Sequence, residues 1–121
     1  MTFVLPYPPS TNTAYAVVRG RKIKTKKARE YAQAVLDEIT YAFHVRGEPR
    51  TLHPHNRLVT KVEIFTPDKR RRDLENTTKI AIDALMKALS LDDSQIDELH
   101  LYRRSVDRSN PRLVITVEPL L

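Results

Sequence analysis

Two stretches of this chain carry apolar residues at helical spacing, and each has an apolar stripe on one face only. The first follows Thr25, a good N-cap residue, and continues to about Val45. The second runs from Leu74 to about Leu89. A one-sided helix has to bury its stripe against another element. We therefore expect a sheet that both helices cover.

The segments that can supply this sheet alternate in apolar character or are rich in β-branched residues, and turn residues bound them. They are Phe3 to Leu5 before a proline-rich loop, a hairpin of Tyr15–Val18 and Lys22–Lys24 with Gly20 at its tip, Leu58 to Phe65, Ile96 to Val106, and Leu113 to Val117. The order of elements predicts an α+β fold: a two-layer domain with a mixed β-sheet and two main helices packed on one face. At 121 residues, the chain is long enough for one such domain, spanning residues 1–121, and too short for two.

Composition restricts the partners and the chemistry. Lys and Arg total 21 against 15 Asp and Glu, a net charge of +6, which favours an anionic partner such as nucleic acid. Cysteine is absent, so thiolate chemistry and cysteine zinc sites are excluded. Two glycines cannot form a glycine-rich phosphate loop, and we expect no nucleotide cofactor. No segment has the pattern of a signal peptide or membrane span, so we expect a soluble cytoplasmic protein without membrane contact.

Cations crowd the start of both predicted helices, although the positive N-terminal pole of a helix prefers acidic neighbours. Single exposed cations are screened and harmless, but two clusters at two helix starts favour bound phosphates. The predicted nucleic-acid-binding residues are Lys22, Lys24, Lys26 and Lys27 at the first start and Lys69, Arg70, Arg71 and Arg72 at the second. We expect affinity for nucleic acid to fall steeply with salt.

The second start differs because Asp73 and Glu75 follow the arginines directly. Either residue alone is typical of a helix cap or first turn, and the ladder of Glu75, Lys79, Asp83 and Lys87 is typical of a solvated helix face. If the strand at Ile96 pairs beside the one ending at Pro67, however, Asp92-Asp93 reaches the sheet edge where Asp73 lies. Three converging carboxylates repel one another unless a divalent cation such as Mg²⁺ binds between them. Lys79, one turn into the helix, could then stabilise a phosphate.

At these residues the chain resembles the RusA family of Holliday junction resolvases, small metal-dependent nucleases that act on four-way DNA. The resemblance covers nearly the whole length. It is carried by the loop Pro8-Pro9-Ser10-Thr11-Asn12, the basic region from Gly20 to Lys27, the run from Pro67 to Asn76, Lys79, Asp83-Ala84-Leu85, and Asp92-Asp93-Ser94-Gln95-Ile96.

The resemblance implies metal ligands at Asp73, Glu75 and Asp93, and a catalytic set completed by Lys79. The cofactor it implies is Mg²⁺, with Mn²⁺ as a substitute. It also implies a homodimer that nicks a four-way junction symmetrically in DNA recombination and repair, and a phage or prophage gene would fit such an enzyme. Glu75 stands where the resemblance leads us to expect Asp in the best-known member of the family, and the extra methylene can alter rate or metal preference.

Two other functions remain open from the sequence. In a catalytically silent nucleic-acid-binding module, Asp73 and Glu75 would only cap a helix and Asp92-Asp93 would only form a turn. Neutralising these acids would then tighten binding and abolish no activity. A nuclease selective for flaps or replication forks would share the same site and differ only in substrate.

Overall fold

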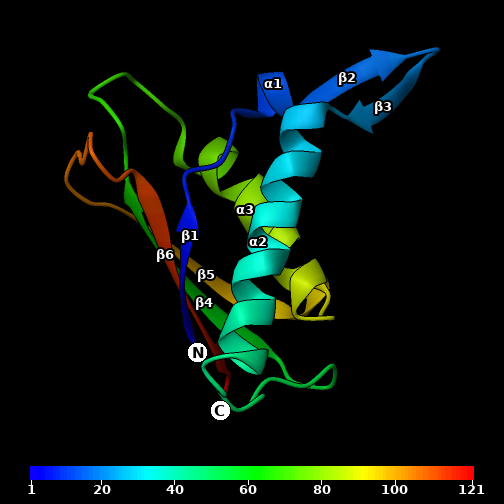
Figure 1. Cartoon of the computed structure of the whole chain (residues 1–121), viewed down its shortest axis with the longest axis vertical. Coiled ribbons are helices and arrows are strands. Elements are labelled where there is room, and N and C mark those ends of the chain that lie inside the picture. Colours follow the sequence, from blue (N-terminus) through cyan, green and yellow to red (C-terminus); the bar gives the residue numbers. More distant parts are fainter.

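The computed structural model describes residues 1–121, except for the side chains of Thr11 and Asn12. A mixed four-stranded sheet forms one layer and two long helices form the other (Figure 1). The strand order is β1-β6-β4-β5, in which β6 runs antiparallel to both β1 and β4, and β5 runs parallel to β4. The strands of this sheet are β1 (Thr2–Pro6), β4 (Leu58–Phe65), β5 (Ile96–Arg103) and β6 (Arg112–Pro119).

Both long helices cover the same face of the sheet (Figure 1), which confirms the predicted α+β architecture. They are α2 (Lys26–His44) and α3 (Leu74–Ala88). The N-cap of α2 is Thr25, as predicted, and its side chain accepts a hydrogen bond from the Ala28 amide at 3.4 Å. Alternation along β4 turns Leu58, Val62 and Ile64 toward the helices, where they are fully buried.

The core lies between the helical layer and the inner face of the sheet. Val35 and Ile39 of α2 and Leu85 of α3 are buried there against the strands. The Tyr31 hydroxyl donates a hydrogen bond to the Pro6 carbonyl at 2.7 Å, and burial raises the pKa of this phenol. This contact joins α2 to the end of β1.

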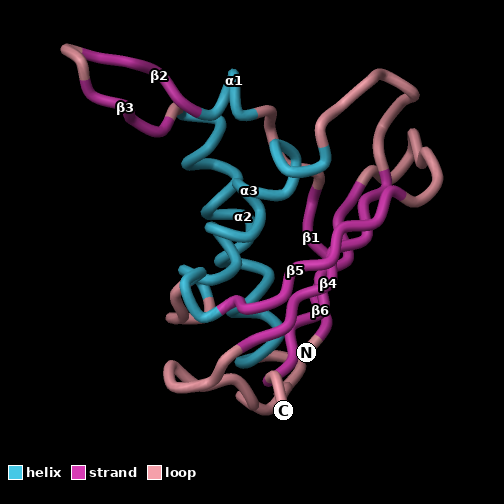
Figure 2. The backbone as a smooth tube through the Cα atoms, turned by 180° about the vertical axis from the view of Figure 1, so that it is seen from behind, coloured by secondary structure: helices cyan, strands magenta, loops and turns pink.

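The predicted hairpin is present and does not join the main sheet (Figure 2). It consists of β2 (Tyr15–Val18) and β3 (Arg21–Lys24), with Gly20 at the tip in a left-handed conformation (φ 75°). One element was not predicted: Thr11–Ala14 forms a short helix, α1, where the sequence indicated a loop. A single turn of helix is too short to give a periodic signal. Among the described residues, no helix is both long enough and apolar enough to cross a membrane.

Candidate active site

Asp73 is the N-cap of α3, and it fixes the first turn of this helix. Its carboxylate accepts a hydrogen bond from the Glu75 amide at 2.9 Å, and its carbonyl accepts one from the Thr77 hydroxyl at 3.1 Å. Glu75 and Lys79 are both exposed and lie four residues apart on one face of the helix. The same capping geometry that an ordinary helix uses therefore presents these two side chains to solvent.

Asp93 lies on a turn that a buried glutamine holds in place. The Gln95 side chain accepts a hydrogen bond from the Asp92 amide at 3.0 Å and donates to the His53 and Asn56 carbonyls at 3.1 and 2.9 Å. The Asp92 carboxylate accepts from the Ser94 amide at 3.0 Å, which completes a capping box. The turn is thus attached to the loop before β4 and leaves Asp93 exposed.

A cleft of about 530 Å³ runs between α3 and the edge strand β5. Its lining includes the apolar side chains of Ile82 and Leu99 and the ammonium-bearing side chain of Lys79. Four carboxylates also line it: Glu75, Asp83, Asp93 and Asp97. A cleft that is acidic inside a basic protein is suited to a cation held next to an anionic ligand.

Asp83 is the acid of this cleft whose carboxyl pKa is raised. Partial burial raises the pKa of its carboxyl, and the neighbouring Asp93 charge raises it further. Lys79, Lys24 and Lys87 oppose this rise in pKa. Asp83 is therefore part of the site and is not a freely solvated rung of the helix ladder, as its spacing had indicated.

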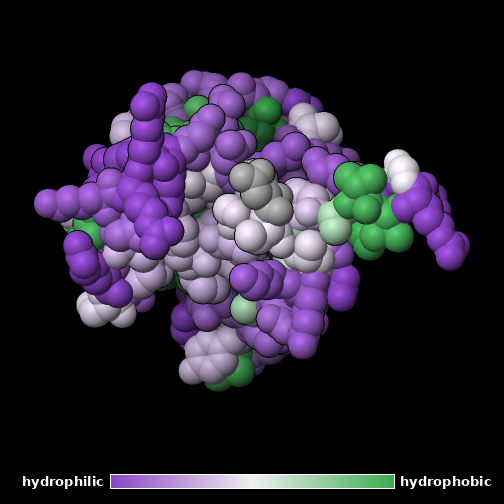
Figure 3. All heavy atoms as spheres, turned by 90° about the horizontal axis from the view of Figure 1, so that it is seen from above, coloured by the Kyte–Doolittle hydropathy of each residue, from purple (hydrophilic) through white to green (hydrophobic). Residues whose placement is uncertain are grey.

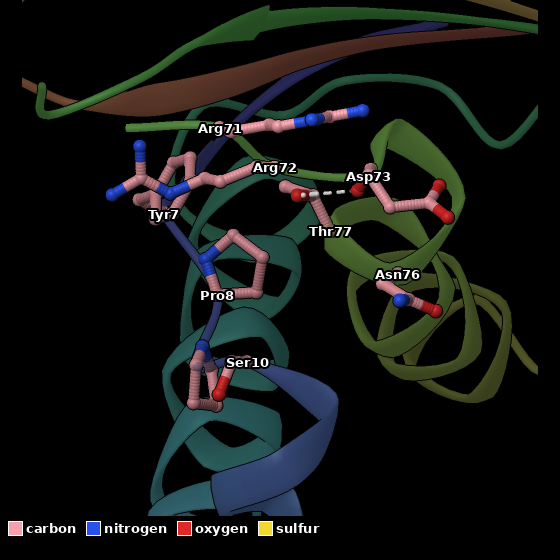
Figure 4. A pocket seen from close by; sticks show the side chains of 9 residues that line it. Tyr7, Pro8, Ser10, Arg71, Arg72, Asp73, Asn76 and Thr77 are labelled. Atoms are coloured by element: carbon pink, nitrogen blue, oxygen red, sulfur yellow. Dashed lines mark hydrogen bonds between the residues drawn. The ribbon is translucent and has the colours of Figure 1, made fainter. Parts of the chain in front are cut away.

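Asp73 is one of the residues that line a second, smaller cavity of about 240 Å³ (Figure 4). This cavity is lined by Tyr7, Pro8, Pro9, Ser10, Arg71, Arg72, Asp73, Asn76 and Thr77. In Figure 4 the Asp73 carboxylate and the Arg72 guanidinium point to opposite sides. Asn76, in the first turn of α3, lines both cavities.

The expected meeting of Asp73 with Asp92-Asp93 at one edge of the sheet is wrong. Because β5 runs parallel to β4, Ile96 pairs with Leu58 at the beginning of β4, whereas Asp73 follows its end. The 15 residues of α3 lie between the two acidic segments, a rise of about 22 Å. Among the residues that the structure describes, no group of three or more His, Asp or Glu side chains is close enough together to hold a metal ion.

The basic run before α3 divides into paired and unpaired cations. Arg72 donates to the Asp68 carboxylate at 2.6 Å, and this bond, with one from the Arg70 amide, lowers the pKa of Asp68 to about 2. The Arg70 side chain also lies 3.5 Å from Asp68. Lys69 and Arg71 are exposed and make no ion pair with any described side chain. These two cations are the ones most available to a phosphate.

The other predicted cations lie on β3 and at the start of α2. Lys22 and Lys24 are exposed on the hairpin, and the Lys22 ammonium lies 4.3 Å from the centre of the Tyr15 ring. Lys26 and Lys27 are exposed in the first turn of α2, where Lys26 makes one long contact of 3.8 Å with Glu30. All four side chains are therefore accessible to an anion, and their role in binding nucleic acid stays a prediction.

Known proteins with similar sequences are DNA endonucleases by description. The model of the family described as endodeoxyribonuclease RusA matches residues 6–118. Crossover junction endodeoxyribonuclease RusA of Escherichia coli K12 is 33% identical over 117 residues, which cover 96% of this chain and 92% of the relative. The protein of the same description from Enterobacteria phage 82 is 32% identical over 93% of this chain and 89% of its own length. The one from Enterobacteria phage HK97 is 36% identical over 84% of this chain and 80% of its own length.

The chain belongs to the RusA family of endodeoxyribonucleases. Both acidic segments and both basic segments of the candidate site lie inside the region that the RusA family model matches. The relatives named above come from a bacterium and from bacteriophages.

The carboxylates of this RusA-family chain are of the ligand type that a hard divalent cation takes, although within the described residues of one chain no three of them lie close enough together to hold one. All the candidate ligands in the cleft are oxygen donors, which suit Mg²⁺ or Mn²⁺ better than softer metals. Mg²⁺ in proteins is commonly bound by one or two carboxylates together with water and substrate phosphate oxygens. Glu75 and Asp93 in the cleft, with Asp73 beside it, are the predicted residues that could supply these contacts.

Sequence reasoning missed three contributors to this site. Asp83 and Asp97 line the cleft, and Asp97 pairs with Arg57 from the start of β4. Gln95 holds the turn that carries Asp93. The helical spacing from Lys79 to Asp83 was the available signal for one of them. Asp83 lines cavities with residues of the hairpin, of α2 and of β5, so its partial burial depends on tertiary packing and could not be seen in the sequence.

Proposed function

We propose that this protein is a Mg²⁺-dependent, structure-selective endodeoxyribonuclease that resolves Holliday junctions by paired, symmetric nicks. One observation carries the proposal: similarity to a curated crossover junction endodeoxyribonuclease extends over 96% of this chain and 92% of the relative. Because the relatives are bacterial and phage proteins, we place the activity inside a bacterial cell, on chromosomal or phage DNA.

In this proposal Asp73, Glu75 and Asp93 hold the cation, and Lys79 acts on the phosphate. A bound divalent cation stabilises the charge that develops at a scissile phosphate and makes water more acidic. Lys79 projects from the same helix face as Glu75, and its ammonium would neutralise a non-bridging phosphate oxygen as charge accumulates there. Lys69 and Arg71 would position the neighbouring phosphates of the strand.

We further propose that the enzyme works as a homodimer whose two subunits share each metal site. Within one chain, Glu75 precedes Asp83 by eight residues of α3, about 12 Å along the helix axis, and Asp93 lies next to Asp83. A twofold axis near this cleft would bring Asp93 of one copy toward Asp73 of the other. The same symmetry would present two active sites to strands of like polarity in a junction.

The first experiment compares the protein with Asp73→Asn and, as a matched control, Asp37→Asn on the exposed face of α2. Labelled substrates are a mobile four-way junction, a replication fork, a flap and a linear duplex, each with Mg²⁺, Mn²⁺ or EDTA. The proposal expects paired nicks on the junction with either metal, lost in EDTA and in Asp73→Asn, and kept in Asp37→Asn. Binding by all three proteins without cleavage would leave a nucleic-acid-binding module. Preferred cleavage of the fork or flap would reassign the substrate.

The second experiment tests the shared site by mixing two inactive proteins. Asp73→Asn and Asp93→Asn chains with different tags are co-expressed, and the heterodimer is isolated by both tags. If sites are shared, one of the two sites in this heterodimer contains only intact residues, and the junction is nicked on one strand. If each site lies within one chain, both sites carry a substitution and no nicking returns.

A further inference from the structure

The β2–β3 hairpin projects from the domain as a separate arm (Figures 1 and 2). Its base is fixed by Thr25, whose amide donates to the Ala14 carbonyl at 2.8 Å and whose hydroxyl donates to the Thr13 carbonyl at 2.6 Å. Every residue from Val17 to Lys24 is exposed. The arm is therefore held at its base and uncovered beyond it.

This arm exposes apolar side chains to an unusual degree. Val17 is 75% exposed, Val18 48% and Ile23 44%. Figure 3 shows a group of apolar atoms on the projecting arm, just before its hydrophilic tip. A two-stranded hairpin gains little stability from its own contacts. Apolar side chains gathered on such an element are typical of a surface that binds a partner.

The charge of the arm identifies the chemistry of that partner. Four cations accompany the three apolar residues, namely Arg19, Arg21, Lys22 and Lys24, and no acidic residue precedes Glu30 in the chain. A second copy of the same arm would be repelled by this charge. A partner that offers both phosphates and apolar surface satisfies both features, and DNA with uncovered base-pair faces is such a partner.

We propose that the hairpin places Val17 and Val18 against the base-pair faces that are exposed at the branch point of a four-way junction, while its cations contact the surrounding phosphates. This inference rests on the proposed function. A linear duplex has its base pairs stacked throughout, so the apolar contact is available only where the stack is interrupted. The hairpin would thereby contribute to selectivity for junctions. Its base is near the catalytic helix, since Tyr15 and Lys24 line one small cavity with Asp83 of α3.

The test measures binding in the Asp73→Asn background, with and without Val17→Ser together with Val18→Ser. Dissociation constants are measured for a four-way junction and for a duplex of the same sequence, and 2-aminopurine at the branch point reports unstacking. We expect junction affinity to fall about tenfold, as the loss of buried valine surface predicts, while duplex affinity changes less than about twofold. The 2-aminopurine signal should also be lost.

Two controls separate this role from a general loss of structure. Val45→Ser makes the same change at a valine that is 66% exposed at the opposite end of α2, and it should leave both affinities unchanged. Val17→Ile together with Val18→Ile keeps apolar side chains at both positions and should keep the junction preference. Equal losses on junction and duplex, or no loss on either, would overturn the inference. The inference would also be overturned if sedimentation showed that Val17→Ser with Val18→Ser dissociates a dimer, because the arm would then be a contact between copies.

The outcomes also separate this inference from the proposed function. Wild-type protein that unstacks the junction through the hairpin but never cleaves it would retain the inference and refute the resolvase activity. If the wild-type protein cleaves junctions and the serine variant keeps the same junction preference, the resolvase activity is retained and the inference about the hairpin is refuted.

Discussion

Replacing Gln95 with leucine removes the side chain that holds the acidic turn before β5. Gln95 is 6% exposed and makes three hydrogen bonds, to the Asp92 amide and to the His53 and Asn56 carbonyls. Leucine fills much of the same volume but can make none of these bonds. The substitution therefore isolates the contribution of the hydrogen bonds from that of packing.

The magnitude follows from the number of bonds lost. A buried hydrogen bond contributes about 1 kcal/mol net, and a backbone group left without a partner raises the loss, so three bonds predict a decrease in unfolding free energy of about 3 kcal/mol. Gln33→Leu is the matched control, because Gln33 is exposed on α2 and makes one side-chain bond, to Asp37 at 2.9 Å. We expect this control to change stability by no more than about 0.5 kcal/mol.

Urea unfolding followed by circular dichroism measures both variants, at several protein concentrations so that any dimer is accounted for. Junction cleavage should fall in Gln95→Leu below the unfolding transition, because Asp93 lies on the turn that Gln95 fixes. If Gln95→Leu and Gln33→Leu unfold within about 0.5 kcal/mol of each other, the assignment of Gln95 as the anchor of this turn is refuted.

Three further predictions concern charge, core and catalysis. The folded pKa of Asp68 is depressed to about 2, so its pairing with Arg72 stabilises the protein above pH 3.8 and this stabilisation is lost as the pH falls toward 2. The unfolding free energies of wild type and Asp68→Asn, measured in urea at a series of acidic pH values, should therefore converge. A difference in unfolding free energy that stays constant with pH would exclude this linkage. Leu85→Ala empties a fully buried position and should lower unfolding free energy by about 2 to 5 kcal/mol in urea titration, whereas a loss below about 1 kcal/mol would contradict its place in the core. Lys79→Met should slow single-turnover junction cleavage by about 100-fold or more with binding little changed. Equal losses in binding and rate would instead make Lys79 a DNA contact.

Local signals in the sequence were sufficient for most elements. Thr25 and Asp73 are N-caps as predicted, because a cap depends only on the residues within one turn of it. Gly20 lies at the hairpin tip because the backbone there needs a positive φ. The short helix α1 was not predicted, since four residues cannot show a helical period.

The placement of Asp93 depended on the direction of strand pairing. Its strand begins beside the beginning of β4, and α3 crosses the sheet between the two acidic segments. A strand, a helix and a second strand in succession are typical of a parallel pair, so this signal was present in the sequence. That β4 and β5 are neighbours does not by itself decide which of their ends meet; the direction of pairing does.

The sequence by itself determined the helices, the strands and which residue types are available for a metal and for phosphates, because spacing, caps and charge are local properties of the chain. Only the tertiary structure decided which of these residues meet. It placed Glu75, Asp83 and Asp93 on one cleft and left Asp73 on a second cavity that shares only Asn76 with that cleft. The physical reason is that α3 buries its apolar stripe by running back across the sheet, and this long-range packing sets the distance between the two acidic segments.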